Sequence, residues 1–442
     1  MSESTANKES TANKETDKKK KWEGGIAVVP PEYRNLRGFD FFFLWAGAAI
    51  VVVMWLMGSV LASAGFWGAF GGIVAAALIG TLIFALAGVM GSDHGIPSIV
   101  STRASFGVRG AYLGAIMNVI QLIFWCSLNI YLNTVVVQLT SGAIGFPFEW
   151  TTATILCGVV VTLIALGGAV AWKWFTRVAA LGVLILSVVA TWAAFQGTTF
   201  GAVELALPFA GMGPLIALDI CIGMPLSWAP LVSDYTRFGK STKGAFWGTF
   251  ISYTPTMIWF YTTGLILVAL TGTYLPTVAM AAIGLGIPAL LLLWFATITT
   301  NFLNVYSGAM SILTVIPKIK SWIAIVFVGA LGTALALLPW LSLATPFISY
   351  IGQFFVPWFA VVLVHYFYLS KRKLNIEDLY SFKPTGRYWY VGGVSISAIA
   401  TWLIGVGIYE FMKAYGQWVG SALVSFVASI IIYLILYKAI KR

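Results

Sequence analysis

Residues 222–230 read IGMPLSWAP and lie within a run of apolar residues long enough to span a membrane. Proline lacks a backbone N–H and clashes with the preceding helical turn, so Pro225 and Pro230 both interrupt a regular helix. They are expected to free the carbonyls of Cys221 and Leu226. In lipid an unpaired backbone group costs several kcal/mol unless protein or a water-filled cavity satisfies it. A simple kink buffered by neighbouring helices is the alternative, but two prolines within nine residues favour a functional break.

The composition is that of an all-α integral membrane protein. Of the 442 residues, 60% are hydrophobic and 9% are charged, whereas soluble proteins carry about 25% charged residues. A transmembrane helix needs roughly 20 apolar residues, and about twelve such runs follow from Phe41 onward. The predicted spans are 40–65, 68–91, 108–138, 152–170, 177–196, 212–236, 245–271, 281–314, 322–339, 345–369, 389–411 and 417–438.

The positions of the basic residues fix the expected orientation. If both termini are cytoplasmic, every one of the 26 lysines and arginines except Lys413 falls in a cytoplasmic segment. This is the bias that the positive-inside rule requires. We therefore expect a multi-pass plasma-membrane protein with cytoplasmic N- and C-termini. The net charge of +11 follows from this topology and implies no nucleic-acid partner.

The chain divides into four predicted parts. Residues 1–36 form a polar cytoplasmic tail, with STANKE repeated at 4–9 and 10–15, and are expected to be disordered. The parts that follow the tail are a ten-helix transport core (37–369), a cytoplasmic loop (370–388), and two additional helices with a short C-terminal tail (389–442).

The interrupted spans 1 and 6 lie five spans apart. This spacing is that of an inverted repeat of two five-helix halves with the substrate at the midplane.

Two further spans carry polar residues where lipid-facing helices would not. Gln121, Trp125 and Asn129 are spaced i, i+4, i+8 and share one face of span 3, where they could grip a flat ring that forms hydrogen bonds. Span 8 reads TTNFLNVYSG at 299–308, and its neutral oxygens suit a dehydrated Na⁺ or a substrate rich in donors. The alternative is that these side chains hold helices together.

Asp219 lies in span 6, and a carboxylate at membrane depth is a functional candidate. It could carry a proton, or it could pair with a hydroxyl or water. An enzyme is not expected, because the sequence shows no paired carboxylates, histidine cluster or nucleophile–base spacing. A channel is disfavoured because no filter motif repeats.

Three motifs resemble the nucleobase–cation symporter-1 family. DYTRFGKSTKGA (234–245) is similar to that family's loop between spans 6 and 7, and STRASFGVRGAYL (101–113) to the start of its span 3. TTNFLNVYSG (299–308) is similar to its span 8. MPLSWAPLVSDYTRF (224–238) and GIPSIVSTRASFG (95–107) most resemble the hydroxymethylpyrimidine permease branch.

The resemblance implies a cation-coupled importer of a neutral planar heterocycle that works by alternating access. The expected substrate is hydroxymethylpyrimidine, a thiamine precursor; the alternatives are cytosine, another nucleobase or a hydantoin-like compound. We expect Na⁺ as coupling ion, with H⁺ as the alternative, no resident cofactor, no partner except the lipid bilayer, and a monomer.

The resemblance also assigns site residues. The substrate ring would stack on Trp125. The other substrate contacts would be Gln121, Asn129, Met224, Ser227, Trp228 and Asn301. Na⁺ would lie between carbonyls near Gly47 and Val51 and the hydroxyls of Thr299 and Thr300, and Asp219 is the possible proton site. Relatives that carry cytosine have a stacking aromatic near Met224–Pro225; here the nearest is Trp228.

Overall fold

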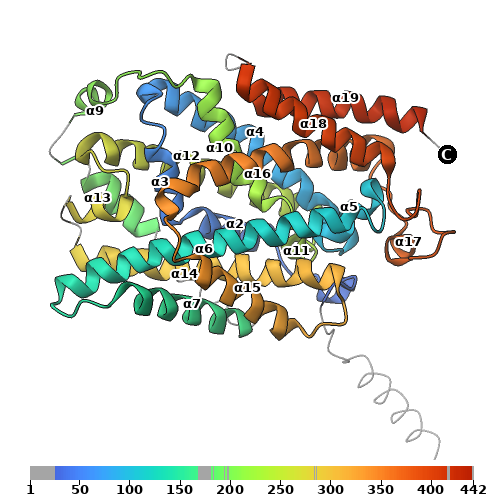
Figure 1. Cartoon of the computed structure of the whole chain (residues 1–442), viewed down its shortest axis with the longest axis horizontal. Coiled ribbons are helices and arrows are strands. Elements are labelled where there is room, and N and C mark those ends of the chain that lie inside the picture. The colour runs from blue at the N-terminus through green and yellow to red at the C-terminus, as the bar shows by residue number, and fades with distance from the viewer. Residues whose placement is uncertain are drawn as a thin grey trace, which may run out of the picture.

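The computed structural model describes residues 25–167, 181–182, 184–193, 195–196, 199–282, 284, 286–415 and 419–440. Within these ranges the regular structure is helical, and no strand is present (Figure 1). The helices that span the bundle are α2 (Gly38–Ala49), α3 (Val52–Ser59), α4 (Gly65–His94), α6 (Ala111–Ala143), α7 (Trp150–Leu166), α10 (Pro214–Trp228), α11 (Val232–Thr236), α12 (Thr242–Thr271), α14 (Gly286–Val315), α15 (Ser321–Leu335), α16 (Trp340–Leu363), α18 (Ile396–Tyr415) and α19 (Ser421–Ala439). Short elements connect them: η1 (Pro31–Tyr33), α5 (Ser98–Phe106), α9 (Phe200–Ala206), α13 (Pro276–Ala282), η2 (Val364–Leu369) and α17 (Ile376–Tyr380).

Each predicted span contains a helix. Among the described residues, eight helices are long and apolar enough to cross a membrane, and the bent pair α2–α3 makes a ninth. Three shorter apolar helices, at Trp150–Leu166, Leu184–Ala193 and Ser321–Leu335, fall in the remaining predicted spans. The span predicted at 177–196 lies partly outside the described residues. The last two spans begin later than predicted, since α18 starts at Ile396 and α19 at Ser421.

The first span is broken as the inverted-repeat fold requires. α2 and α3 meet at an angle of 55°. Between them Ile50 leaves the helical region and Val51 is extended, with φ −138° and ψ 152°. Both residues are buried. The break therefore exposes backbone polar groups to the protein interior and not to lipid.

The sixth span is interrupted later than the sequence suggests. α10 continues through Pro225 to Trp228, and a turn over 229–231 separates it from α11. Leu226 does not have a free carbonyl, because the N–H of Ala229 donates to it at 3.2 Å. The expectation that Pro225 breaks the helix is thus wrong, and the interruption coincides with Pro230. The Pro225 ring instead packs into the space left by Gly80 of α4, where an added Cβ would overlap it.

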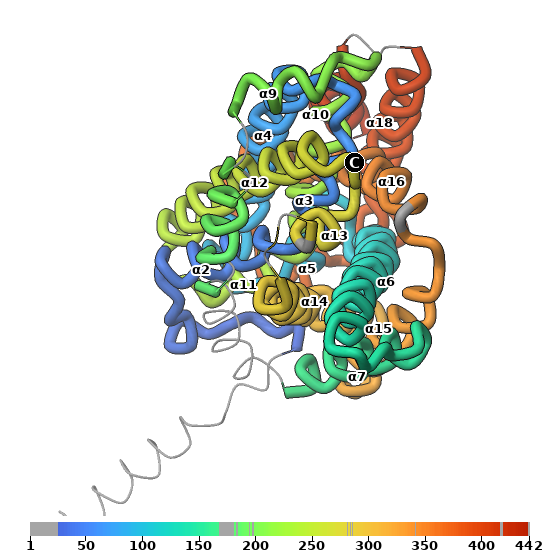
Figure 2. Tube along the Cα trace, turned by 90° about the vertical axis from the view of Figure 1, so that its left-hand side faces the viewer, coloured from blue at the N-terminus to red at the C-terminus, as the bar shows by residue number. Residues whose placement is uncertain are grey.

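The helices form two packed groups joined through the centre. In the view of Figure 2, α4, α10 and α12 lie together, with α6, α7 and α15 on the other side. α14 packs along α6, and α12 also contacts α2 and α3. α18 and α19 pack against each other and on α16 at one edge (red in Figure 1). The broken helices α2–α3 and α10–α11 therefore lie inside the bundle.

Part of the predicted tail is ordered. Val29 is fully buried, and its N–H donates to the Gly95 carbonyl at 2.8 Å. Arg34 donates through Nη2 to the His94 carbonyl at 3.1 Å. Residues 25–36 therefore pack on the bundle, in contrast to the expected disorder, while residues 1–24 lie outside the described ranges. This segment meets α5, α11 and α17 at the end of the bundle that carries Arg34, Arg103, Arg237 and Arg372, which we call the basic end.

Candidate functional site

The polar face predicted on α6 is present and points at the end of α10. Gln121, Trp125 and Asn129 are all buried. The Gln121 amide donates through Nε2 to the Ser227 carbonyl at 2.8 Å and to Asn118 Oδ1 at 2.7 Å. Gln121 therefore connects α6 to α10 one turn before the interruption.

This face also holds buried polar atoms that have no hydrogen-bond partner in the described part of the chain. They are Gln121 Oε1, Trp125 Nε1 and Asn129 Oδ1. Asn129 uses only its Nδ2, which donates to the Trp125 carbonyl at 2.9 Å. Because buried polar atoms are paired in the great majority of cases, unpaired ones on a single helix face indicate that a polar ligand or water completes them.

Two residues of this region were missed by the sequence reasoning. Phe347 of α16 contacts Trp125, with ring centroids 5.1 Å apart and planes at 70°. Asn133 lies four residues after Asn129 on the same face and is fully buried. Neither of its amide atoms has a hydrogen-bond partner among the described residues. The i+4 spacing could have identified Asn133. No local signal could have identified Phe347, which lies far along the chain.

The α10 residues line the opposite side. Ser227 Oγ donates to the Met224 carbonyl at 2.6 Å, and both residues are buried. Trp228 packs edge-on against Trp45 of α2, with centroids 5.9 Å apart. The aromatic ring in contact with Trp125 is thus Phe347, while Trp228 belongs to a separate cluster around Trp45.

Asn301 holds α14 against α6. Its Nδ2 donates to the Cys126 carbonyl at 3.1 Å, and its Oδ1 accepts from Asn304 Nδ2 at 3.0 Å. The side chain is fully buried. Both ends of the amide are therefore already used within the protein, in contrast to the unpaired atoms of Gln121.

Of the residues predicted to hold a cation, Thr300 and Gly47 are in contact near the break of the first span. Thr300 Oγ1 of α14 lies 3.3 Å from the Gly47 carbonyl of α2. Val51 lies in the same break. Thr299 Oγ1 bonds the Ala296 carbonyl of its own helix at 2.8 Å. Neutral carbonyl and hydroxyl oxygens at a broken helix are a suitable donor set for Na⁺.

Asp219 has a structural partner that the sequence did not reveal. Its Oδ2 accepts from the Ser421 N–H at 2.6 Å, and its Oδ1 accepts from the Ala422 N–H at 2.9 Å. The carboxylate thus caps the N-terminus of α19, where the helix dipole favours a negative charge. It lies two turns of α10 before Ser227, roughly 12 Å along the axis.

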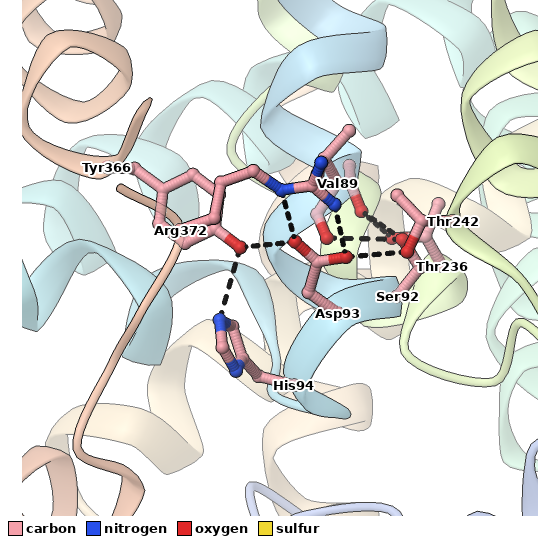
Figure 3. Close-up of polar contacts among 9 residues, drawn as sticks. Val89, Ser92, Asp93, His94, Thr236, Thr242, Tyr366 and Arg372 are labelled. Atoms are coloured by element: carbon pink, nitrogen blue, oxygen red, sulfur yellow. Dashed lines mark hydrogen bonds and ion pairs between the residues drawn. The ribbon is translucent and has the colours of Figure 1, made fainter. Parts of the chain in front are cut away.

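A second polar cluster closes the basic end (Figure 3). Arg372, from the loop after η2, binds Asp93 at the end of α4 with a bidentate pair of 2.8 and 3.0 Å. Thr242 at the start of α12 and Tyr366 of η2 also donate to this carboxylate, at 2.5 and 2.6 Å. The Tyr366 hydroxyl lies 3.1 Å from His94 Nε2. Three segments distant in sequence, namely α4, the start of α12 and the region from η2 to Arg372, therefore meet at one carboxylate.

Comparisons with known proteins agree with this architecture. The chain is 25% identical to the allantoin permease of Bacillus subtilis, with 92% of each chain covered. It is 22% identical to the hydantoin permease of Microbacterium maritypicum, covering 86% of this chain and 83% of that one.

The fold has a solved counterpart. A nucleobase-cation-symport-1 family transporter, in a closed conformation with bromovinylhydantoin bound, superposes with a TM-score of 0.84 at 19% identity over 94% of this chain and 95% of that one. The family model described as "Permease for cytosine/purines, uracil, thiamine, allantoin" matches residues 28–435. The chain therefore belongs to this permease family, the nucleobase–cation symporter-1 family, and is a multi-pass membrane transporter and not an enzyme.

Proposed function

We propose that the protein imports a neutral planar heterocycle, hydroxymethylpyrimidine, across the plasma membrane in symport with Na⁺. The observation that carries this proposal is the buried α6 face, where an amide oxygen, an indole N–H and a second amide oxygen remain unpaired beside the interruption of α10. The seven proposed substrate residues carry no charge, so a charged ligand would lie there without a counter-ion. An aminopyrimidine supplies what this face lacks, since its amino and hydroxyl groups donate and its ring nitrogens accept.

The names of the relatives support a second candidate of the same chemistry. Allantoin and hydantoin are also neutral, small and rich in N–H groups, and two relatives carry these names. Either ring could use the same unpaired atoms. The two candidates differ in the exocyclic groups that the site must accommodate, so direct competition separates them.

Uptake into proteoliposomes tests the proposal. We expect saturable accumulation of radiolabelled hydroxymethylpyrimidine under an inward Na⁺ gradient, with weaker competition from cytosine, hydantoin and allantoin. Each amide left unpaired by a poorer ligand costs about 1–3 kcal/mol, which is roughly a 5- to 150-fold loss in affinity. If hydantoin or cytosine competed more strongly than expected, that compound would replace hydroxymethylpyrimidine as the proposed substrate. No saturable uptake of any of these compounds under a Na⁺ or proton gradient would reject the heterocycle-importer proposal.

The cation is proposed to bind between the Gly47 and Val51 carbonyls and the hydroxyls of Thr299 and Thr300. We expect Thr300→Val to raise the half-saturating Na⁺ concentration about tenfold. The variant removes one oxygen ligand, and a loss of about 1.4 kcal/mol in binding free energy lowers affinity tenfold. Thr299→Ala should act in the same direction and weaken Na⁺ dependence more than substrate affinity.

Thr314→Val is the matched control for the cation site. Thr314 is also buried in α14, but it lies fourteen residues after Thr300, roughly 21 Å along the helix from the contact with Gly47. This variant should keep the wild-type Na⁺ dependence. Uptake that is independent of Na⁺ and is driven by an imposed pH gradient would overturn Na⁺ coupling. Asp219→Asn would then test the proton alternative.

Alternating access gives a role to the cluster formed by Asp93, Thr242, Tyr366 and Arg372. With both termini cytoplasmic, as we propose, the basic end faces the cytoplasm. We propose that release of substrate on that side separates η2 and the following loop from α4, to which Asp93 joins them through Tyr366 and Arg372. Opening toward the cytoplasm would then break these contacts.

A further inference from the structure

A cavity at the basic end contains a buried arginine that has no acidic partner among the described residues. Arg103 of α5 is 1% exposed. Within the described ranges its guanidinium makes one hydrogen bond, from Nη1 to the Leu379 carbonyl of α17 at 3.0 Å, and its Nε has none. Arg372 and Lys413, by contrast, each pair with a carboxylate in the described part of the chain. A buried charge without a counter-charge destabilises the fold unless a ligand supplies one.

Aromatic rings compensate this charge only in part. The guanidinium carbon lies 5.3 Å from the Phe382 ring centroid and 5.8 Å from that of Tyr380. Such contacts stabilise the charge only weakly and leave the Nε–H without a partner in the described part of the chain. The arrangement therefore supplies a positive charge and a free donor, with flat apolar walls beside them.

The space next to Arg103 is large enough for a ligand. The cavity has a volume of about 320 Å³ and is bordered by residues of five separate segments. Tyr112 at the start of α6 stacks on Phe382, with centroids 6.3 Å apart. Pro317 borders the cavity, and the exposed Lys318 and Lys320 follow it in the chain. The exposed lysines would draw anions toward this end of the bundle.

We propose that this cavity binds a phosphate group, with Arg103 as its principal ligand. The guanidinium fork matches phosphate oxygens in geometry and charge, and charge-assisted hydrogen bonds of this kind are about twice as strong as neutral ones. The aromatic walls suit a phosphate monoester that carries an aromatic ring. The headgroup of an anionic lipid offers the same chemistry from the membrane side. A bound phosphate would join α5, α6, α14 and the loop that carries α17.

The test is thermal unfolding of the full chain in nanodiscs of phosphatidylcholine, with phenyl phosphate or inorganic phosphate as probe and chloride at equal ionic strength as reference. We expect phenyl phosphate at saturating concentration to raise the melting temperature by about 3 °C. Arg103→Gln should abolish this shift. Arg109→Gln should keep it, because Arg109 lies on Trp389, 4.7 Å from that ring centroid, and does not border the cavity.

A second variant keeps the test decisive if Arg103→Gln fails to fold. Tyr112→Phe removes only a hydroxyl at the cavity, and we expect it to weaken phenyl phosphate binding about threefold to tenfold. Nanodiscs that contain phosphatidic acid distinguish the source: a lipid ligand would stabilise the wild type there and remove its response to phenyl phosphate. The proposal is overturned if neither phosphate nor phosphatidic acid stabilises the wild type, or if Arg103→Gln responds like the wild type.

Discussion

Replacing Gly264 with alanine is expected to prevent assembly of the folded transporter. Gly264 lies where α12 crosses α3, and an added Cβ would overlap the backbone carbonyl of Trp55. The crossing is reciprocal, since a Cβ at Gly58 of α3 would overlap the carbonyl of Tyr261. Backbone atoms cannot move aside as a flexible side chain does, so the two helices would have to separate.

Moving α3 away from α12 would cost much of the free energy of folding, because the residues around this crossing are fully packed. Trp55 is completely buried and stacks on Phe260 of α12, with centroids 4.8 Å apart and planes at 13°. Overpacking typically costs about 1–3 kcal/mol and occasionally more, and a clash with backbone on both helices belongs at the upper end. We expect Gly264→Ala to lose the monodisperse peak in fluorescence-detected size-exclusion chromatography.

Gly71→Ala is the control for Gly264→Ala. Gly71 lies inside α4, and nothing lies within 4 Å of the Cβ that alanine would add. Alanine is a better helix former than glycine by about 1 kcal/mol, so this variant should melt at or above the wild-type temperature. A Gly264→Ala protein that elutes and melts like Gly71→Ala would show that the α3–α12 crossing tolerates a larger separation.

The span pattern could be predicted because lipid imposes simple rules on the sequence. Spanning segments must be long and apolar, and lysine and arginine mark their ends, so each predicted span contains a helix. The position of the break in span 6 could not be predicted. Pro225 is accommodated within α10, where Gly80 of α4 makes room for its ring, and that contact depends on residues far apart in sequence.

The candidate site likewise has one part that the sequence predicts and one part that it does not. The face formed by Gln121, Trp125 and Asn129 follows from helical periodicity, and all three side chains are buried. Contacts made across the fold have no local signature. From the sequence Asp219 could carry a proton or pair with a hydroxyl or water, and only the structure shows that its oxygens cap α19 about two hundred residues later. Asp93 and Arg372 likewise show their pairing only when the helices are assembled.

Gln121→Met is expected to reduce substrate uptake about 10- to 100-fold while leaving the protein folded. Methionine nearly matches glutamine in length, so it preserves the packing of α6. It removes the donor to the Ser227 carbonyl and the unpaired Oε1 that we assign to the substrate. Leaving one buried group unpaired costs about 1–3 kcal/mol, and the lost substrate hydrogen bond adds to it.

Uptake rate at low substrate concentration, normalised to the amount of folded protein, measures this effect. Ile120→Met introduces the same residue at the neighbouring position, whose apolar side chain is 51% exposed, and it should change uptake less than twofold. The substrate-induced rise in melting temperature should disappear in Gln121→Met and persist in Ile120→Met. Because the two variants differ by one position on the same helix, equal uptake by both would remove Gln121 from the site and would shift the substrate away from the α6–α10 contact.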